Sequence, residues 1–565
     1  MTTSTHVYTA AIVGTPDVPL RIKGGSITLD DTQAPHVTGT VTVAIPDQTT
    51  LALLDPRNST RLRVSVTATS PSFTAQARTF NLGIRDREVR HAAGEVALGV
   101  ASDEAILGDY APLADDTGTF THQGSLRALC NYVLGKIGAA LAAAPAGDAD
   151  VSTYADATNL ITDGSIEGGG SIYAGGNCTL DKNDTSWYVA GSRSLLLYSP
   201  TSDDSFVDVA GGAGGMRLGM VAGGTYTFSA TGNVKVALSG TFNASALRLV
   251  AVWKVGASYY AARSDPLPNV VGSAARVAVT FTIPTDATEA FVRVYLGATS
   301  GQVRWDGLRL STPTGDPTDI AYFDGATAST AGYSYAWTGA ANASTATRKA
   351  LIDRPVSSLT WKAGVSALDF LTPIVQAAGY RPVCDEARTW TLRSASYEAP
   401  GSLSIRHAVN LIDGTDAIKR DEGLWFDAQV TRYRWTEGGV SKERVDAYSL
   451  TGSPTRVNLL DIEAPFPGAG RSQYAVQRAQ SQGRTVTATA VADWRATAEQ
   501  WAEFYLLGAP IQTGKTSRVV FDLDTDRMTV TTRTSDTPAS AWVLIPVGSK
   551  WTDQPAGGSW TGEVI

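Results

Sequence analysis

The chain has 565 residues, of which 43% are hydrophobic, with a formal net charge of −8 at pH 7 and a pI near 5.3. This length is too great for one hydrophobic core and predicts about three to five domains. Nucleic-acid binding needs a surplus of Lys and Arg on one face, and the chain has no such cluster, so no nucleic-acid partner is expected. The sequence has no run of about 18 apolar residues and no signal-like start, so neither a membrane span nor a secretory leader is expected.

Residue types that often carry catalysis or bind metals are scattered. Cys130, Cys178 and Cys384 are odd in number and far apart, which argues against a disulfide framework and against CxxC metal sites. None of the five histidines lies in a GxSxG or HExxH context. We therefore predict no catalytic residue, although paired carboxylates for glycoside cleavage can come from any part of a fold.

Residues 1–110 alternate apolar and polar positions in short runs, as in 39–45. Period two with frequent Thr and Val, interrupted by Pro, predicts antiparallel strands with one buried face, in a barrel or a sandwich. A helix is expected at 125–141, where apolar residues recur every three or four positions after Ser125, and a linker follows at 142–150.

The composition changes at 155–348, which holds 25 of the chain's 55 glycines and few charged residues. Short strands at regular spacing, such as 247–253, 276–283 and 290–296, predict a two-sheet jelly roll. Residues 333–337 then place three aromatic side chains on one face of a further strand.

The earlier pattern returns near residue 349. Ser366 and Asp369 have capping spacing at the start of an expected helix at 366–378, which Pro373 would kink. Residues 383–392 predict a strand, a turn and a second strand.

The C-terminal part is expected to be mostly strands, interrupted by a helix at 498–507 with Thr497 and Gln500 at capping spacing. The alternate acids at 522–526 have the spacing of a calcium loop, but Arg527 stands where glycine is needed. A tight hairpin turn is the favoured interpretation of this segment.

Aromatic residues of the middle segment are candidates for sugar binding. Sugars present apolar C–H faces and hydroxyls, so their sites combine an exposed ring with nearby polar side chains. Trp253, Tyr259 and Tyr260 flank one turn, and Trp187 and Tyr188 follow a polar run. We predict these five rings as a glycan platform. The alternative is that they fill the core of the sandwich.

Glu167 and Asp306 lie near the first and last strands of the same segment. Because adjacent end strands would bring them together, we consider a shared structural calcium, with two ordinary surface carboxylates as the alternative. No other cofactor is expected.

Several stretches of the middle segment resemble the jelly-roll carbohydrate-binding modules attached to xylanases and glucanases. These stretches are 159–167, 191–195, 222–229 and 305–310. A Gly-Ser-Phe-Glu motif opens the domain in that family, and Ile166 replaces Phe here. The resemblance implies a sugar-binding module, and the family's calcium ligands would map onto Glu167 and Asp306.

The flanking regions resemble the minor tail proteins of siphophages that infect actinobacteria. The motifs that carry this resemblance are 322–325, 335–339, 479–483 and 540–546. Residues 78–83 with 101–105, and 384–390 after the later helix, also fit a baseplate hub, in which β-barrel domains bracket a small α/β domain. The resemblance implies a homotrimer at the tail tip of the virion, made in the host cytoplasm. Its implied partners are the distal tail protein, the tape measure and further minor tail proteins.

These patterns predict a mainly β, multidomain protein: β-barrel hub domains with a small α/β element and an inserted β-sandwich of jelly-roll type. The expected segments are an N-terminal barrel at 1–110, a helix and linker at 111–154, the inserted module at 155–312, an aromatic β extension at 313–348, a small α/β segment at 349–400 and a β-rich domain at 401–565.

The expected function is structural, without enzymatic activity: a tail-tip protein whose inserted module binds host cell-wall or capsular glycan during adsorption. One alternative is a glycan-degrading tail enzyme with an attached binding module. Another is a purely structural hub whose insert contacts a different tail protein.

Overall fold

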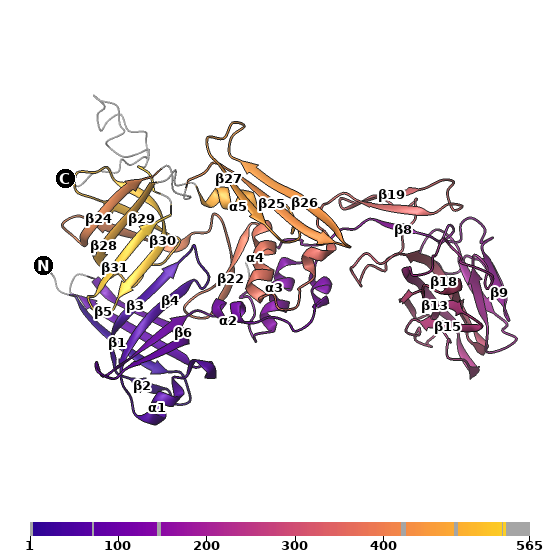
Figure 1. Ribbon diagram of the computed structural model, residues 1–565, viewed down its shortest axis with the longest axis horizontal. Helices are drawn as coiled ribbons and strands as arrows, with labels where there is room; N and C mark the ends of the chain where they lie inside the picture. Colours follow the sequence, from indigo (N-terminus) through magenta and orange to yellow (C-terminus); the bar gives the residue numbers. More distant parts are fainter. Residues whose placement is uncertain are drawn as a thin grey trace. The chain divides into compact units, whose positions relative to one another are not determined.

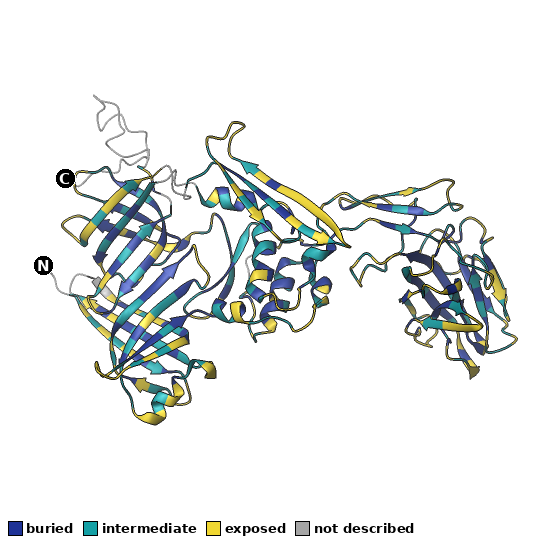
Figure 2. Ribbon diagram, viewed as in Figure 1, coloured by how far each residue is buried: buried dark blue, intermediate teal, exposed yellow. Residues whose placement is uncertain are grey.

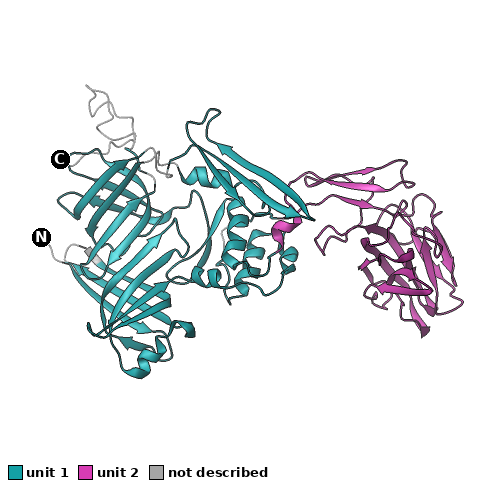
Figure 3. Cartoon of the chain, in the orientation of Figure 1, with its two compact units in different colours: residues 1–151, 361–565 teal, residues 152–360 magenta. Residues whose placement is uncertain are grey.

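The structure, a computed structural model, describes residues 4–70, 73–143, 148–419, 425–479, 484–533 and 535–537. It confirms the mainly β, multidomain fold expected from the sequence. The chain separates into two compact units, one formed by residues 1–151 and 361–565 and the other by residues 152–360 (Figure 3). In the described part of the chain, no helix has the length and apolar character needed to cross a membrane.

A thirteen-stranded sheet in the first unit takes strands from both ends of the chain (Figure 1). Its main path runs through β2 (Val18–Leu20), β1 (Thr5–Ile12), β5 (Arg61–Ser70), β6 (Phe73–Arg90), β7 (Glu95–Ala101), β4 (Val37–Ala44), β3 (Ile22–Asp30), β30 (Gln512–Asp522), β31 (Arg527–Thr532), β28 (Arg484–Val491) and β24 (Leu411–Ile418). Two further strands, β29 (Gln500–Tyr505) and β23 (Ala399–Arg406), continue from β30. Short helices α1 (Gln48–Leu53) and η1 (Pro56–Asn58) precede β5.

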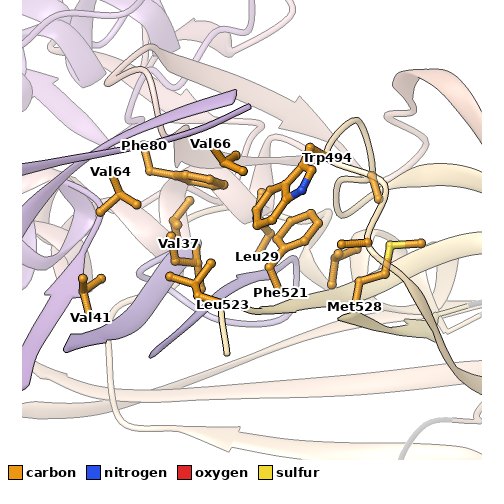
Figure 4. Close-up of a cluster of buried hydrophobic side chains, with 14 of the residues drawn as sticks. Leu29, Val37, Val41, Val64, Val66, Phe80, Trp494, Phe521, Leu523 and Met528 are labelled. Atoms are coloured by element: carbon orange, nitrogen blue, oxygen red, sulfur yellow. The ribbon is translucent and has the colours of Figure 1, made fainter. Parts of the chain in front are cut away.

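The two ends of the chain meet where β3 pairs antiparallel with β30, with Ile27 opposite Phe521. Phe521 is fully buried, and its ring stacks on Trp494 at 4.5 Å between centroids (Figure 4). Phe80 of β6 lies 6.4 Å from the same ring. The sequence predicted an N-terminal barrel at 1–110 and a β-rich domain at 401–565, and strands of both segments lie in this one sheet. Alternation along a strand predicts which face is buried, but it does not predict which strand will pair with it.

The helix expected at 498–507 is wrong, because this segment forms strand β29. Ala502 and Phe504 are buried while Trp501 is exposed, which is the period of a strand. The capping spacing is nevertheless used, since the Thr497 N–H donates to Gln500 Oε1 at 3.2 Å in the preceding turn. Pairing with β23 and β30 has overridden the local helical preference. The segment 522–526 is a hairpin turn between β30 and β31, as expected.

A helical part of the first unit contains α2 (Glu104–Asp109), η2 (Gly118–His122), α3 (Leu126–Gly135) and α4 (Ala367–Ala377). Ser125 accepts from the Ala128 N–H and caps α3, which ends at Gly135 instead of the expected 141. Ser366 caps α4 by accepting from the Asp369 N–H at 3.0 Å, and the helix continues through Pro373. The expected hairpin at 383–392 forms β21 (Tyr380–Cys384) and β22 (Trp390–Ser394).

A three-stranded sheet completes the first unit. Its order is β26 (Val440–Ser449), β25 (Ala428–Glu437) and β27 (Val457–Ile462). Helix α5 (Arg471–Arg478) packs on one face, where Ser472 donates to the Asp446 carbonyl. β26 is mostly exposed along its length (Figure 2).

The second unit contains a sandwich of two five-stranded antiparallel sheets. One sheet has the order β10 (Thr179–Asp184), β11 (Ser194–Tyr198), β18 (Ala298–Ser311), β13 (Thr225–Phe242) and β16 (Ala274–Thr282). The other has the order β15 (Ser258–Arg263), β14 (Leu249–Val255), β17 (Ala287–Tyr295), β12 (Phe206–Val209) and β9 (Tyr173–Gly176). A small sheet of β19 (Tyr333–Trp337), β20 (Ala346–Ala350) and β8 (Ala157–Asn159) and the turn η3 (Val356–Leu359) complete the unit.

The two ends of the second unit lie side by side. The Tyr154 N–H donates to the Arg354 carbonyl at 2.8 Å, and β8 pairs antiparallel with β20. Adjacent ends let a compact unit interrupt another one without unfolding it. In the described residues, no strand of this unit belongs to a sheet of the first unit.

Asn159 fixes the start of the sandwich against its last strand. Its buried side-chain amide donates to the carbonyls of Leu308 and Phe323 at 3.1 and 3.3 Å, and its oxygen accepts from the N–H of Leu310 at 3.1 Å. We expect Asn159→Ala to lower the free energy of unfolding by about 1–3 kcal/mol, because buried backbone groups lose their partners. Chemical denaturation measures this loss, and a change no larger than that of the exposed Asn183→Ala would contradict it.

Candidate functional site

The outer face of the sheet β15-β14-β17-β12-β9 is a candidate binding surface. Side chains alternate along β14, so Trp253 faces the sandwich core while Val252 faces outward. The register places Val252 beside Phe291 of β17, and Lys254 between Tyr259 of β15 and Glu289 of β17. We call this side of the sheet the outer face.

The outer face has its own apolar cluster, separate from the sandwich core. Val250, Val252, Phe291 and Tyr295 are buried there, and Phe206 packs against them. The rings of Phe206 and Tyr295 lie 5.4 Å apart. The sandwich core is complete without this second apolar layer. The layer therefore indicates that the outer face is an ordered surface with a role of its own.

Charged side chains cover this cluster in fixed positions. The Arg293 guanidinium lies 3.7 Å from the centroid of the Phe206 ring and donates to Asp208 at 2.6 Å. Although burial works against it, the hydrogen bond to Asp208 raises the pKa of Arg293. Lys254 donates to Glu289 at 2.9 Å, and this bond lowers the pKa of Glu289. Each ion pair thus places hydrogen-bond donors and acceptors beside aromatic carbon.

Tyr259 is the exposed ring of the outer face. Half of the residue is exposed, at 51%, and its hydroxyl donates to Glu289 Oε2 at 3.2 Å. Its ring meets Phe291 edge to face at 6.4 Å. A fixed, exposed ring beside paired charges is the combination that a sugar ring with hydroxyls requires.

The structure places the five predicted aromatics in three locations. Tyr259 lies on the outer face. Trp253 is half-buried at the edge of the core, stacked on Phe281, and the exposed Tyr260 lies opposite it in the register. Trp187, half-buried, and Tyr188, exposed, lie in the connection between β10 and β11 of the other sheet. The five rings therefore do not form one platform.

Sequence reasoning missed the residues that surround Tyr259. The signal was present in β17, where Glu289, Phe291, Arg293 and Tyr295 occupy every second position and so share one face. A strand with aromatic and charged residues on one side and buried aliphatic residues on the other has two functional faces. The missing information was the register that brings Phe206 and Asp208 beside them.

The predicted calcium residues are satisfied by hydrogen-bond donors. Asp306 is buried and accepts from the N–H groups of Val189, Ala190 and Gly307 at 2.6 to 2.8 Å, and burial raises its pKa to about 6. Glu167 accepts from the N–H of Ser192 at 2.6 Å. Among the described residues, no group of three or more His, Cys, Asp or Glu side chains is placed to hold a metal. These residues do not fit a shell of roughly 6–8 oxygen ligands, which is what calcium takes.

Comparisons with known proteins find likeness in structure alone. No protein-family model matches the chain, and no curated protein sequence matches it. The chain is similar to the tail protein from Neisseria meningitidis MC58, with 9% identity, a TM-score of 0.37 and coverage of 93% of this chain and 96% of that one. It is also similar to the 43 kDa tail protein of prophage MuSo2 from Shewanella oneidensis, with 7% identity, a TM-score of 0.34 and coverage of 94% and 96%.

Part of the chain is similar to the C-terminal family 22 carbohydrate-binding module of Clostridium thermocellum Xyn10B. The identity is 16% and the TM-score 0.20, with coverage of 27% of this chain and 91% of that one. These structural neighbours are thus two tail proteins that cover most of the chain and a carbohydrate-binding module that covers a part of it, all at low identity. Likeness at this level does not establish a common family.

Proposed function

We propose that the chain is a tail-tip protein of a siphophage virion, and that residues 152–360 bind a host cell-surface glycan through the outer face. The tail assignment is supported by the resemblance of the flanking motifs. Of those motifs, residues 480–483 and 540–546 lie outside the described residues. In this proposal the protein binds the host cell without catalysing a reaction. The first unit takes part in the assembly of the tail, and the second unit binds the cell surface.

One observation carries the binding proposal: an exposed Tyr259 ring is fixed beside the Lys254–Glu289 pair, on the same face as an apolar cluster that the sandwich core does not need and that Arg293 and Asp208 cover. The ring offers a plane for the C–H face of a sugar. The pairs Lys254–Glu289 and Arg293–Asp208 offer donors and acceptors for its hydroxyls, from partly exposed side chains.

A single such site is weak, because one stacked ring contributes only about 1 kcal/mol beyond area burial. We propose that the protein acts as a homotrimer at the tail tip, alongside the distal tail protein and the tape measure. Copies in one ring make the second contact intramolecular, which turns weak single contacts into long-lived attachment.

Two neighbouring tyrosines give a matched test of the site. Tyr259 and Tyr260 are equally exposed, at 51%, but belong to opposite faces of β15. We expect Tyr259→Ala to weaken the binding of purified polysaccharides by roughly fivefold, equal to about 1 kcal/mol, while Tyr260→Ala leaves it unchanged. Affinity electrophoresis of the full chain in cell-wall and capsular polysaccharides measures both.

The alternatives give different results in the same experiment. Loss of binding in Tyr188→Ala but not in Tyr259→Ala would move the site to the β10–β11 connection. No retardation by any polysaccharide would favour an insert that contacts another tail protein. Release of reducing sugar during the run would favour the glycan-degrading enzyme.

A further inference from the structure

Four arginines gather around two buried carboxylates in the first unit, far in sequence from the proposed glycan site. Arg381 and Arg393 lie directly opposite each other on β21 and β22. Like charges in this position destabilise a sheet unless a counter-charge lies between them. Glu499 supplies one, with its Oε2 atom 2.8 Å from Arg381 and 2.9 Å from Arg393.

The other two arginines come from α5 and from the end of β31. Arg478 and Arg533 lie 3.1 and 2.8 Å from Asp31 Oδ2, which follows β3. They are 3.6 and 3.9 Å from Glu499 Oε1, too far for a hydrogen bond. We call these six residues the arginine cluster; its formal charge is four positive and two negative, which leaves a net charge of two positive.

The cluster is buried. Neither carboxylate side chain has any exposed area, and the four arginine side chains are between 10% and 14% exposed. Burial of uncompensated charge is costly, so a net positive cluster in this position favours an anion. Two neighbouring basic groups have lowered pKa values, with burial as the main cause and the arginines as a further one. Burial, together with Arg393 and Arg381, lowers the pKa of His36 to about 4, and burial together with Arg533 lowers the pKa of Lys515.

Both donors and acceptors in the cluster lack hydrogen-bond partners among the described residues. The unpartnered donors are Nε of Arg381, Arg393 and Arg533, Nη2 of Arg381 and Nη1 of Arg478. The unpartnered acceptors are Oδ1 of Asp31 and Oε1 of Glu499. Buried polar groups are nearly always satisfied, so a ligand for this cluster needs oxygens that accept and at least one hydroxyl that donates.

We propose that the arginine cluster binds a small protonated oxyanion, of which hydrogen phosphate is the probe. Its charged oxygens accept from the guanidinium groups, which suit phosphate geometry, and its hydroxyl donates to Asp31 or Glu499. Sulfate has charge and oxygens but no proton to donate at neutral pH, so it leaves the carboxylate acceptors unpaired. The buried position suits a free anion and not a group attached to a membrane or a polymer.

The test measures the melting temperature of the full chain in the presence of different anions. The protein is first dialysed into phosphate-free buffer, and the ionic strength is held constant. We expect phosphate to raise the melting temperature by roughly 5 °C at a hundredfold excess over Kd, with a smaller shift from sulfate and none from chloride. Isothermal titration with phosphate should show saturable heat. No phosphate shift, or equal shifts from all three anions, would overturn the proposal.

A pair of variants locates the site. Arg478→Gln should abolish the phosphate shift, whereas Arg495→Gln, whose side chain is 71% exposed on the same unit, should retain it. A folded Arg478→Gln protein that keeps the full shift would place the anion elsewhere and overturn the assignment. If Arg478→Gln does not fold, the wild-type anion series still decides. The glycan experiment does not depend on this result, because it concerns residues 152–360.

Discussion

Replacement of Asp319 by Asn is expected to lower the free energy of unfolding of the second unit by about 3–5 kcal/mol. Asp319 pairs with Arg309 at 2.9 Å and with Arg348, whose side chains are only 2% and 6% exposed. The carboxylate thereby ties the last sandwich strand, β18, to β20 of the small sheet. Its loss leaves two buried guanidinium groups without their counter-charge. Chemical denaturation of the full chain, followed by hydrogen exchange in residues 152–360, measures the effect.

The control for this variant is Asp286→Asn, an exposed acid between β16 and β17 of the same unit. Surface substitutions of this kind usually change stability by no more than about 0.5 kcal/mol. Equal effects of the two variants would show that Asp319 is not the counter-charge of the pair.

The lowered pKa of Asp319 also predicts how the stability of the second unit depends on pH. Although burial opposes ionisation, the hydrogen bonds from Arg348 and Arg309 hold its pKa well below the usual range. A lowered folded-state pKa contributes stability above the unfolded value of about 3.9 and loses it as the pH falls below that value. We expect wild-type stability to fall with pH in this window, and the Asp319→Asn protein to show a flatter profile.

The second large effect is expected from Phe521→Ala, which should lower the free energy of unfolding of the first unit by about 3–5 kcal/mol. The ring is fully buried and contacts Trp494 and Phe80, so one cavity removes packing from both ends of the chain (Figure 4). We expect hydrogen exchange to accelerate together in β3 and β30, because they pair in one sheet.

The control for this variant is Leu507→Ala, a residue that is 73% exposed and follows β29 in the same unit. It should change stability by no more than about 0.5 kcal/mol. Faster exchange in β30 alone, with β3 still protected, would show that the two ends of the chain fold as separate bodies.

Local patterns predicted local structure well. Ser366 and Asp369 predicted the start of α4, and Arg527 in place of glycine predicted the hairpin after β30. The helix at 498–507 failed because Trp501 and Phe504 fit a helical spacing as well as a strand, and only pairing with β23 and β30 distinguishes the two.

The candidate site could be predicted only in part. Tyr259 was predicted as a sugar-binding residue, and the structure places it on the outer face. Asp208 and Phe206 of the same face are about fifty residues earlier in the chain and reach this face only through the order β14-β17-β12. Strand order depends on long-range pairing, which a single sequence does not encode in any local spacing.

The most direct test of the division between assembly and adhesion is a deletion. Residues 154 and 354 are joined by a backbone hydrogen bond, so a short Gly-Ser linker can replace residues 155–353. We expect the shortened chain to keep the melting transition of the first unit and to lose retardation by every polysaccharide that retards the full chain. Retained polysaccharide binding, or a first unit that no longer folds, would contradict the proposed separation of roles.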